Sequence, residues 1–349
     1  MTGWRRAAAA ALASLVAPVA LVVGTPDPVG ADPGGAPDVA RSRPVLTWQD
    51  RRITESSGLA DGGRVLFTVN DSGDGPVVYA AAKRTGRTRS ATTYSEGDVT
   101  DVEALAPGRD GSLWVADTGD NEHERETVAV YHLPRMGRLP ERVSASRFEL
   151  DYPEGSPDAE ALLADPRSGR LYVVTKSVLG GTVYRAPEPL RAGAVNRLEP
   201  VARVPGVVTD GAFLPDGGHV LLRTYTSLSV FTFPGWERVG TTRLPRQRQG
   251  EGLAVSRSGE IYLSTEGAYS QVLQVFLPDE LVAELGRHGA SLPATPSPAP
   301  AAGTNRDPAS PPRSTGEGGG IWIAGGVTVA TLAGWLVFTA VRPRSRRNR

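Results

Sequence analysis

A short acidic phrase recurs along this 349-residue chain at intervals of 41 to 57 residues. Aligning the copies places one residue of each in a single column: Ser57, Glu103, Glu160, Asp210 and Glu251. A small residue follows each of them and an apolar one comes next, as in EALA at 103–106. A repeat of this length restricts the fold to an array of similar units that bury their apolar faces against one another.

Each copy opens a unit of four short apolar segments separated by turns. The second segment is the clearest, as in RVLFTVND at 64–71 and SLWVADTG at 112–119. Its β-branched and aromatic residues alternate with others as they do in strands. Four strands per unit at this period predict the blades of a β-propeller, so we assign the chain to the all-β class.

Five copies of the unit are visible, and we expect five blades between residues 44 and 280. The 57-residue interval after Glu103 has room for a sixth blade, and that alternative stays open here. The fifth unit lacks a fourth strand of its own. The segment PVLTWQDRR at 44–52 precedes the first unit, and we predict that it supplies this outer strand and closes the ring.

Residues 1–31 have the character of a secretory signal peptide. Arg5 and Arg6 come before an apolar run, and the small residues Gly30 and Ala31 suit cleavage after Ala31. An uncleaved N-terminal anchor is the alternative.

The C-terminal end predicts attachment to a membrane. Residues 281–320 are rich in Pro, Ala, Ser and Gly and are expected to form a stalk. Residues 321–341 carry no charge and, as a helix, are long enough to cross the hydrocarbon core. Residues 342–349 hold five arginines and no acid, which predicts a cytoplasmic tail. We therefore expect a single-pass protein of the cell membrane with its propeller outside the cytoplasm.

Composition excludes several kinds of site. Lys and Arg number 38, as do Asp and Glu, so no overall charge argues for nucleic acid as a partner. The chain has no cysteine, and its four histidines do not fall at metal-ligand spacing. We therefore expect no zinc site, and no haem or nucleotide cofactor.

The acidic column predicts a cation site. First strands line the channel of a propeller, and residues two apart on a strand face the same way. We predict that carboxylates of the column and of the position two residues earlier bind a metal ion: Asp101, Glu103, Asp158, Glu160, Asp210 and Glu251. Oxygen ligands alone favour Ca²⁺ or Mg²⁺. A cation would offset a repulsion of about 4 kcal/mol between two carboxylates about 4 Å apart at an effective dielectric constant near 20.

The same column is compatible with roles that need no metal ion, and these stay open here. One or two of the carboxylates could be protonated. They could accept hydrogen bonds from backbone N–H groups of neighbouring blades and so link the blades structurally, or they could serve as a catalytic acid and base.

The ends of the second strands carry further candidates. Three residues lie at the ends of these strands in the last three units: Lys176, Arg223 and Glu266. We predict that they bind a ligand. Because two of them are cations, an anionic ligand is favoured. Neutralising the carboxylates as salt bridges is the alternative role. Asp71 and Asp117 occupy one column in the first two units and open loops that also hold Asp74, Asp120 and Asn121. Asx turns explain these residues, and a cation at the rim is the alternative.

The strand starts at Glu103, Glu160 and Glu251, together with VADTGDN at 115–121, resemble those of bacterial extracytoplasmic propellers of the esterase-like phytase group. The resemblance covers about residues 45–280. It implies a carboxylate-lined channel, in some members with calcium and with hydrolysis of phosphoesters.

Two functions follow as expectations. The first is a membrane-anchored propeller that binds a small-molecule ligand or a surface protein without catalysis, because no nucleophile signature such as GxSxG is present. The alternative is a metal-dependent phosphoesterase or lactonase-like hydrolase that uses the same carboxylates, with Asp101, Glu103, Asp158 and Glu160 holding the ion.

Overall fold

A computed structural model describes residues 39–71, 74–95, 99–135 and 140–290. The chain divides into two units, Met1–Pro296 and Ser297–Arg349, and every described residue lies in the first. The predicted signal peptide, membrane span and tail lie outside the described residues. No helix within the described ranges is long and apolar enough to cross a membrane.

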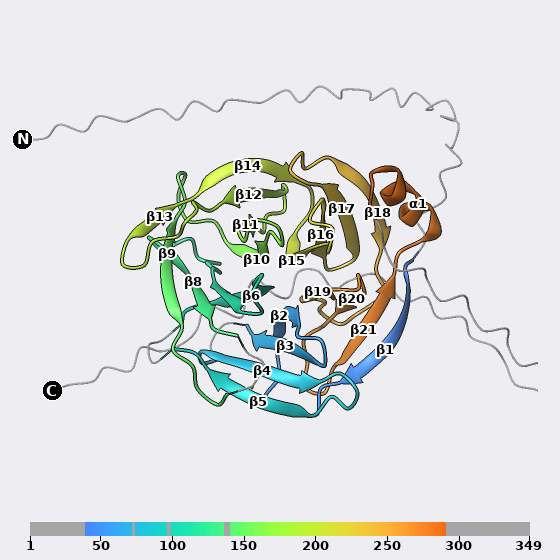
Figure 1. The fold of residues 1–349 in the computed structure, drawn as a ribbon, viewed down its shortest axis with the longest axis horizontal. Helices are drawn as coiled ribbons and strands as arrows, with labels where there is room; N and C mark the ends of the chain where they lie inside the picture. The colour runs from blue at the N-terminus through green and yellow to red at the C-terminus, as the bar shows by residue number, and fades with distance from the viewer. Residues whose placement is uncertain (1–38, 72–73, 96–98, 136–139, 291–349) are drawn as a thin grey trace, which may run out of the picture. The chain divides into compact units, whose positions relative to one another are not determined.

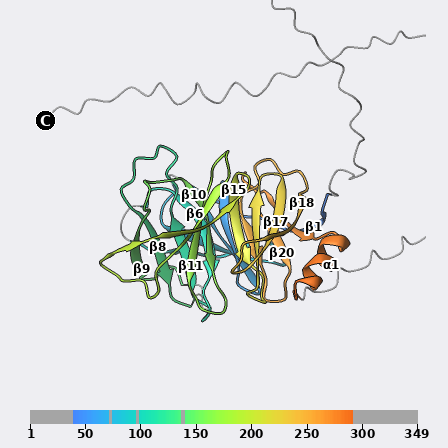
Figure 2. The same cartoon turned by 90° about the horizontal axis from the view of Figure 1, so that it is seen from above.

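Five antiparallel sheets surround a central axis, seen from the end in Figure 1 and from the edge in Figure 2. Blade one contains β2 (Ser56–Asp61), β3 (Val65–Asn70), β4 (Val77–Ala82) and β5 (Thr88–Thr93). Blade two contains β6 (Val102–Pro107), β7 (Leu113–Asp117), β8 (Val128–Leu133), β9 (Ser146–Asp151) and, added parallel to β9, β13 (Val195–Arg197). The long interval after Glu103 thus holds one blade in the described residues.

The remaining three blades repeat the same order of strands. Blade three contains β10 (Ala159–Ala164), β11 (Leu171–Thr175), β12 (Gly181–Arg185) and β14 (Glu199–Val204). Blade four contains β15 (Val208–Phe213), β16 (His219–Thr224), β17 (Ser227–Thr232) and β18 (Arg238–Arg243). Blade five contains β19 (Leu253–Val255), β20 (Ile261–Leu263), β21 (Gln271–Phe276) and β1 (Arg41–Thr47). The five-blade prediction is confirmed.

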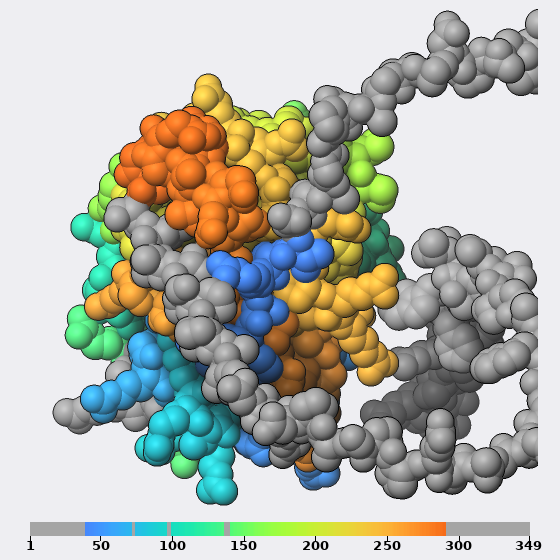
Figure 3. Space-filling model, turned by 90° about the vertical axis from the view of Figure 1, so that its right-hand side faces the viewer, coloured from blue at the N-terminus to red at the C-terminus, as the bar shows by residue number. Residues whose placement is uncertain are grey.

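The ring is closed by the N-terminal strand. β1 pairs antiparallel with β21, from Arg41 opposite Phe276 to Thr47 opposite Gln271. Figure 3 shows the blue residues near the start of the domain in contact with orange residues near its end. The prediction that the segment before the first unit supplies the missing outer strand is confirmed, although the strand spans 41–47 and ends inside the predicted segment.

The small residue of the repeated phrase is required by packing at the axis. Gly58, Ala104, Ala161 and Gly252 are buried, and a Cβ atom at Gly252 would lie 2.4 Å from the carbonyl oxygen of Ser57 in the neighbouring first strand. A Cβ atom at Gly58 would lie 2.6 Å from the backbone nitrogen of Leu105, well inside contact distance. Five buried apolar clusters, one between each pair of adjacent blades, hold the ring together.

The end of the domain differs from the expected stalk. Residues 281–287 form most of the helix α1 (Asp279–Arg287), which packs against β18. Leu281 and Leu285 are buried in the cluster between blades four and five. Polar residues separate the apolar positions of this helix in the sequence, so residues 281–287 were assigned to the linker.

Candidate metal and active site

Five carboxylates meet at one end of the propeller axis, and we call this group the acidic mouth: Asp71, Asp101, Glu103, Asp158 and Glu160. One oxygen each of Asp71, Asp101 and Glu103 lies within 4.8 Å of the others, and the same holds for Glu103, Asp158 and Glu160. Glu103 belongs to both groups and therefore joins blades two and three. The four predicted ligands from these blades are brought together.

The backbone explains why Glu103 and Glu160 point to the axis. Each is the extra residue of a β-bulge, between Val102 and Ala104 in one strand and between Ala159 and Ala161 in the other. A bulge re-aims the side chain of its extra residue. Glu103 and Glu160 are 2% and 3% exposed, so both carboxylates lie inside the mouth.

Burial and repulsion from neighbouring carboxylates raise the pKa values of Asp101 and Glu103. Burial, with the charges of Asp71 and Asp158, raises the pKa of Asp101 to about 6. Burial, followed by the charge of Glu160, raises the pKa of Glu103 well above its ordinary value. The protein alone therefore does little to neutralise the negative charge of these carboxylates.

Two buried carboxylate oxygens have no hydrogen-bond partner among the described residues, Oδ1 of Asp101 and Oε2 of Glu251. Asp101 is 7% exposed and Glu251 is 4% exposed. A buried polar atom without a partner is uncommon and costly in a folded protein. The donor set is all oxygen, which fits Ca²⁺ or Mg²⁺.

Lys176 provides one compensating charge. Its Nζ lies 2.5 Å from Oε1 of Glu160 and 5.8 Å from the ring centre of Tyr225. Burial lowers the pKa of Lys176, but the adjacent Glu160 carboxylate outweighs burial and raises it above its ordinary value. Burial still holds the pKa of Glu160 well above normal, despite Lys176.

Two carboxyl groups beside the mouth titrate near neutrality. Burial raises the pKa of Glu251 to about 7, and Lys176 and Arg223 reduce the shift. Burial, with the charge of Glu251, also raises the pKa of Glu266 to about 7. The side-chain amide of Gln249 donates a hydrogen bond to Glu266.

The loop after β7 encloses the mouth on the side of blade two. The backbone N–H of Asp120 donates to Oδ1 of Asp158 at 3.0 Å, and Nδ2 of Asn121 donates to Oδ2 of Asp101 at 3.4 Å. A Cβ atom at Gly119 would lie 2.3 Å from Oδ2 of Asp101. Asn121 lies in the loop that the sequence offered for Asx turns or a cation at the rim, whereas Gly119 of the same motif was not singled out.

Asp71 and Asp117 are not equivalent residues. Asn70 and Asp117 hold the same place, because the side-chain oxygens of both accept backbone N–H groups at the start of the preceding first strand. Asp117 also forms an ion pair with Arg125 at 2.9 Å. Asp117 therefore stabilises the turn, as was expected for a residue of an Asx turn. Asp71 lies one position further along and joins the mouth.

Asp210 is placed outside the mouth. In the pairing of β15 with β16, Asp210 lies opposite Arg223. The equivalent pair in blade two is Ala104 and Ala116. Asp210 therefore stands where the other blades have the small residue of the repeated phrase. Thr209 fills the bulge position of blade four. The carboxylate of Asp210 is fully buried and accepts the backbone N–H of Leu253 at 2.6 Å, which links blades four and five.

Arg223 is also a link between blades. Its Nη1 donates to the carbonyl oxygens of Gly252 at 2.5 Å and Ser264 at 2.8 Å, and its side chain is completely buried. Lys176 is the residue that follows β11 in blade three. The equivalent residue in blade four, which follows β16, is Tyr225. Lys176, Tyr225 and Glu266 therefore border the mouth, and Tyr225 was not predicted from the sequence.

No protein-family model and no curated protein matches the chain. Among solved structures, a gluconolactonase from Xanthomonas campestris is 17% identical, with 69% of this chain and 87% of that one covered and a TM-score of 0.40. A glucose dehydrogenase is 11% identical over 68% of this chain and 100% of its own, with a TM-score of 0.41. A luciferin-regenerating enzyme is 11% identical over 69% and 96%, with a TM-score of 0.42. These likenesses are remote and say nothing of this chain's activity.

Proposed function

We propose that the acidic mouth binds one divalent cation, Ca²⁺ or Mg²⁺, and hydrolyses an ester-type bond. Asp71, Asp101, Glu103, Asp158 and Glu160 would hold the ion. The observation that carries the proposal is the buried, unpartnered oxygen of Asp101 among carboxylates whose oxygens lie within 4.8 Å of one another in groups of three. A cation held there would polarise a carbonyl or phosphoryl oxygen of a substrate.

The chain's own residues supply proton transfer. Hydrolysis requires a base that accepts a proton from water and an acid that gives one to the leaving oxygen. Glu251 and Glu266, with pKa values of about 7, can do either near neutral pH. Lys176 holds the Glu160 carboxylate in place.

The surroundings favour a lactone or carboxylic ester over a phosphoester. A phosphoester carries charge of its own and needs several cations, whereas Lys176 is already paired with Glu160. Large apolar side chains lie exposed on loops that follow the second strands of blades three to five: Val178, Leu179, Tyr225 and Tyr269. They suit a substrate with an apolar part. Membership of the phytase-like group stays a prediction.

The test combines cation binding with turnover in the full chain in detergent. We expect Ca²⁺ or Mg²⁺ to raise the Tm measured after EDTA treatment, and expect hydrolysis within a panel of lactones, aryl esters and phosphoesters. Glu160→Gln should lose both properties. Glu199→Gln is the matched control, since Glu199 is 63% exposed and pairs with Arg185 on an outer strand. Absence of any cation effect on the wild-type Tm would overturn the cation site.

A second candidate is binding of a ligand or a surface protein without turnover. Val178 and Leu179 favour it, because they are 90% and 92% exposed at the rim. Leu179→Ser would then weaken binding of the partner, whereas Glu160→Gln would leave it intact. We also propose attachment to the cell membrane through residues 321–341, with the propeller outside the cytoplasm, which protease protection in intact cells tests.

A further inference from the structure

The opposite end of the axis carries a cavity of about 1670 Å³, which we call the basic basin. Its floor contains Leu59, Leu105, Leu162 and Leu253, each no more than 1% exposed and two residues after its column position. The acidic mouth lies at the start of the first strands, and the basin lies at their end. This layer of leucines therefore separates the two sites.

Cations dominate the lining of the basin. Lys83 and six arginines line it: Arg64, Arg84, Arg89, Arg109, Arg135 and Arg257. Among the lining residues that the structure describes, Asp61 and Glu260 are the acids, which leaves an excess of five positive charges. The charge is thus opposite in sign to that of the acidic mouth.

Both acids of the basin are engaged within the protein. Asp61 forms an ion pair with Lys83, and Glu260 accepts a hydrogen bond from the hydroxyl of Tyr262 at 2.9 Å. Neither neutralises an arginine.

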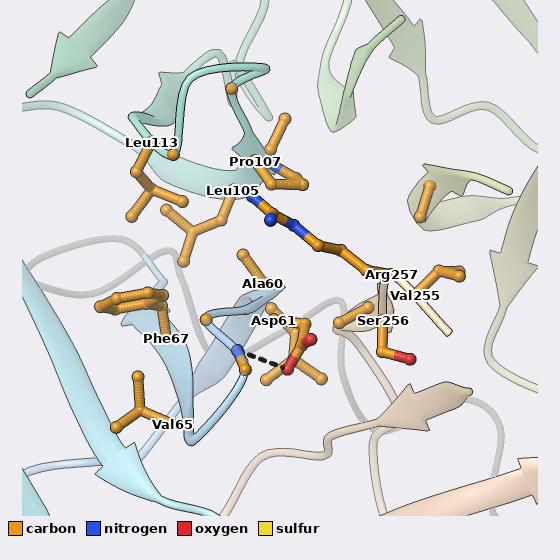
Figure 4. Close-up of a pocket in the computed structure, with 18 of the residues that line it drawn as sticks. Ala60, Asp61, Val65, Phe67, Leu105, Pro107, Leu113, Val255, Ser256 and Arg257 are labelled. Carbon is orange, nitrogen blue, oxygen red and sulfur yellow. Dashed lines mark hydrogen bonds between the residues drawn. The ribbon is translucent and has the colours of Figure 1, made fainter. Parts of the chain in front are cut away.

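The arginine side chains remain available. Arg109 donates to the carbonyl oxygen of Ser168 at 3.1 Å. The other five make no side-chain hydrogen bond or ion pair with a described residue, and all six are exposed. Figure 4 shows Arg257 extending from blade five across the basin toward Pro107 of blade two. Guanidinium groups from different blades therefore converge on one concave space.

We propose that the basic basin binds a soluble polyanion that carries several phosphate groups. Guanidinium groups match phosphate oxygens with two parallel hydrogen bonds, and arginines outnumber lysine six to one here. The volume exceeds that of a usual small-ligand pocket, about 300–1,000 Å³, so one phosphate would not fill it. A concave basin admits a flexible chain of phosphates, whereas a flat lipid surface does not enter it.

Electrostatics predicts the character of this binding. An excess of positive charge in a recess attracts anions from solution and increases their association rate. Binding through several exposed arginines is expected to weaken steeply as salt concentration rises. The leucine layer makes the basin independent of any cation in the acidic mouth, so EDTA should not affect binding.

The experiment measures binding of tripolyphosphate and of short-chain polyphosphate to the full chain in detergent by titration calorimetry. The test variant is Arg64→Gln/Arg257→Gln. Its control is Arg51→Gln/Arg248→Gln, which removes two exposed arginines outside the basin lining. Because all four side chains are exposed, folding should not change. We expect the test variant to bind about tenfold more weakly or worse, and the control to bind like the wild type.

Three results would overturn the proposal. The first is that the wild type does not bind polyphosphate at about 0.15 M salt. The second is that the test variant binds polyphosphate as tightly as the wild type. The third is displacement of polyphosphate by dihexanoyl phosphatidylglycerol, a soluble short-chain lipid, at concentrations where inorganic phosphate has no effect. That result would assign the basin to lipid headgroups.

Discussion

Lys176 and Glu160 form an ion pair inside the acidic mouth, with Nζ 2.5 Å from Oε1. Lys176→Met leaves Glu160 among like charges, and removal of one partner of a largely buried pair costs about 3 kcal/mol. We expect lower stability of the cation-free protein, and a larger rise in Tm on adding Ca²⁺ than in the wild type. Lys83→Met breaks an ion pair at the opposite end and should leave the Ca²⁺ response unchanged. An equal response in all three proteins would contradict a cation at the mouth.

The pH dependence of stability follows from the raised pKa values. The pKa of Glu251 and Glu266 rises from 4.5 to about 7, and that of Asp101 from 3.8 to about 6. The folded state therefore holds these protons more tightly than the unfolded state. Their contribution to stability is fully present below about pH 4 and is lost as pH rises through about 7.

Urea unfolding in EDTA between pH 5 and 8 measures this effect. We expect the free energy of unfolding to fall across the range, and Ca²⁺ to reduce the fall because the cation competes with protons. Glu251→Gln should give a shallower slope. A free energy of unfolding that increases with pH in EDTA would contradict the raised pKa values.

Gly119 is predicted to be essential for the shape of the mouth. In Gly119→Ala the new Cβ would lie 2.3 Å from Oδ2 of Asp101 and 2.7 Å from Oε1 of Glu103, so both carboxylates must move. We expect loss of the cation-dependent rise in Tm and a destabilisation of about 1–3 kcal/mol. Gly75→Ala is the control on the neighbouring blade, because a Cβ there meets nothing within 4 Å. Normal Ca²⁺ affinity in Gly119→Ala would remove this loop from the site.

Arg223→Met separates structural from ligand-binding roles. The change leaves the carbonyl oxygens of Gly252 and Ser264 without their donor, which costs on the order of 3 kcal/mol. We expect a lower midpoint in urea with an unchanged Ca²⁺ titration. A shift in Ca²⁺ affinity without loss of stability would return Arg223 to the ligand site.

The closing strand makes a measurable contribution to stability. Leu46 of β1 is 6% exposed and belongs to the cluster between blades five and one. Leu46→Ala should lower the free energy of unfolding by about 3 kcal/mol. Ser42→Ala on the exposed part of the same strand should change it by less than about 0.5 kcal/mol. Equal effects of the two changes would show that β1 adds no stability through its buried face.

The blades were predictable because apolar alternation and the repeat period carry the same information five times. The closing strand followed from counting, since the last unit lacked a strand and an apolar segment before the first unit was unassigned. Among the site residues, Glu103 and Glu160 were predictable because they fill the same place in adjacent units. Their mutual distance follows once β6 and β10 are neighbours at the axis.

The remaining site residues depend on register, which a repeat of variable length does not determine. Side chains on a strand change faces with each residue, so an offset of one residue reverses a role. Asp210 falls one residue after the bulge position of its blade and binds backbone instead. Asp71 falls one residue after the turn-stabilising position and enters the mouth instead. The turn between the first and second strands differs in length by one residue between these blades, since Ala60 pairs with Phe67, Ala106 with Trp114 and Ala212 with Leu221. Hydrophobic alternation does not reveal such a difference.

The pairing of Arg41 with Phe276 also orders events during synthesis. The first strand of the domain to leave the ribosome finds its partner only after nearly all of the domain has emerged. Until then the chain carries unpaired strand edges, which invite association with other chains. Loss of either terminus of the domain has the same result, an open ring. Closure by β1 thus leaves no unpaired edge on the last blade only when both ends of the domain are present.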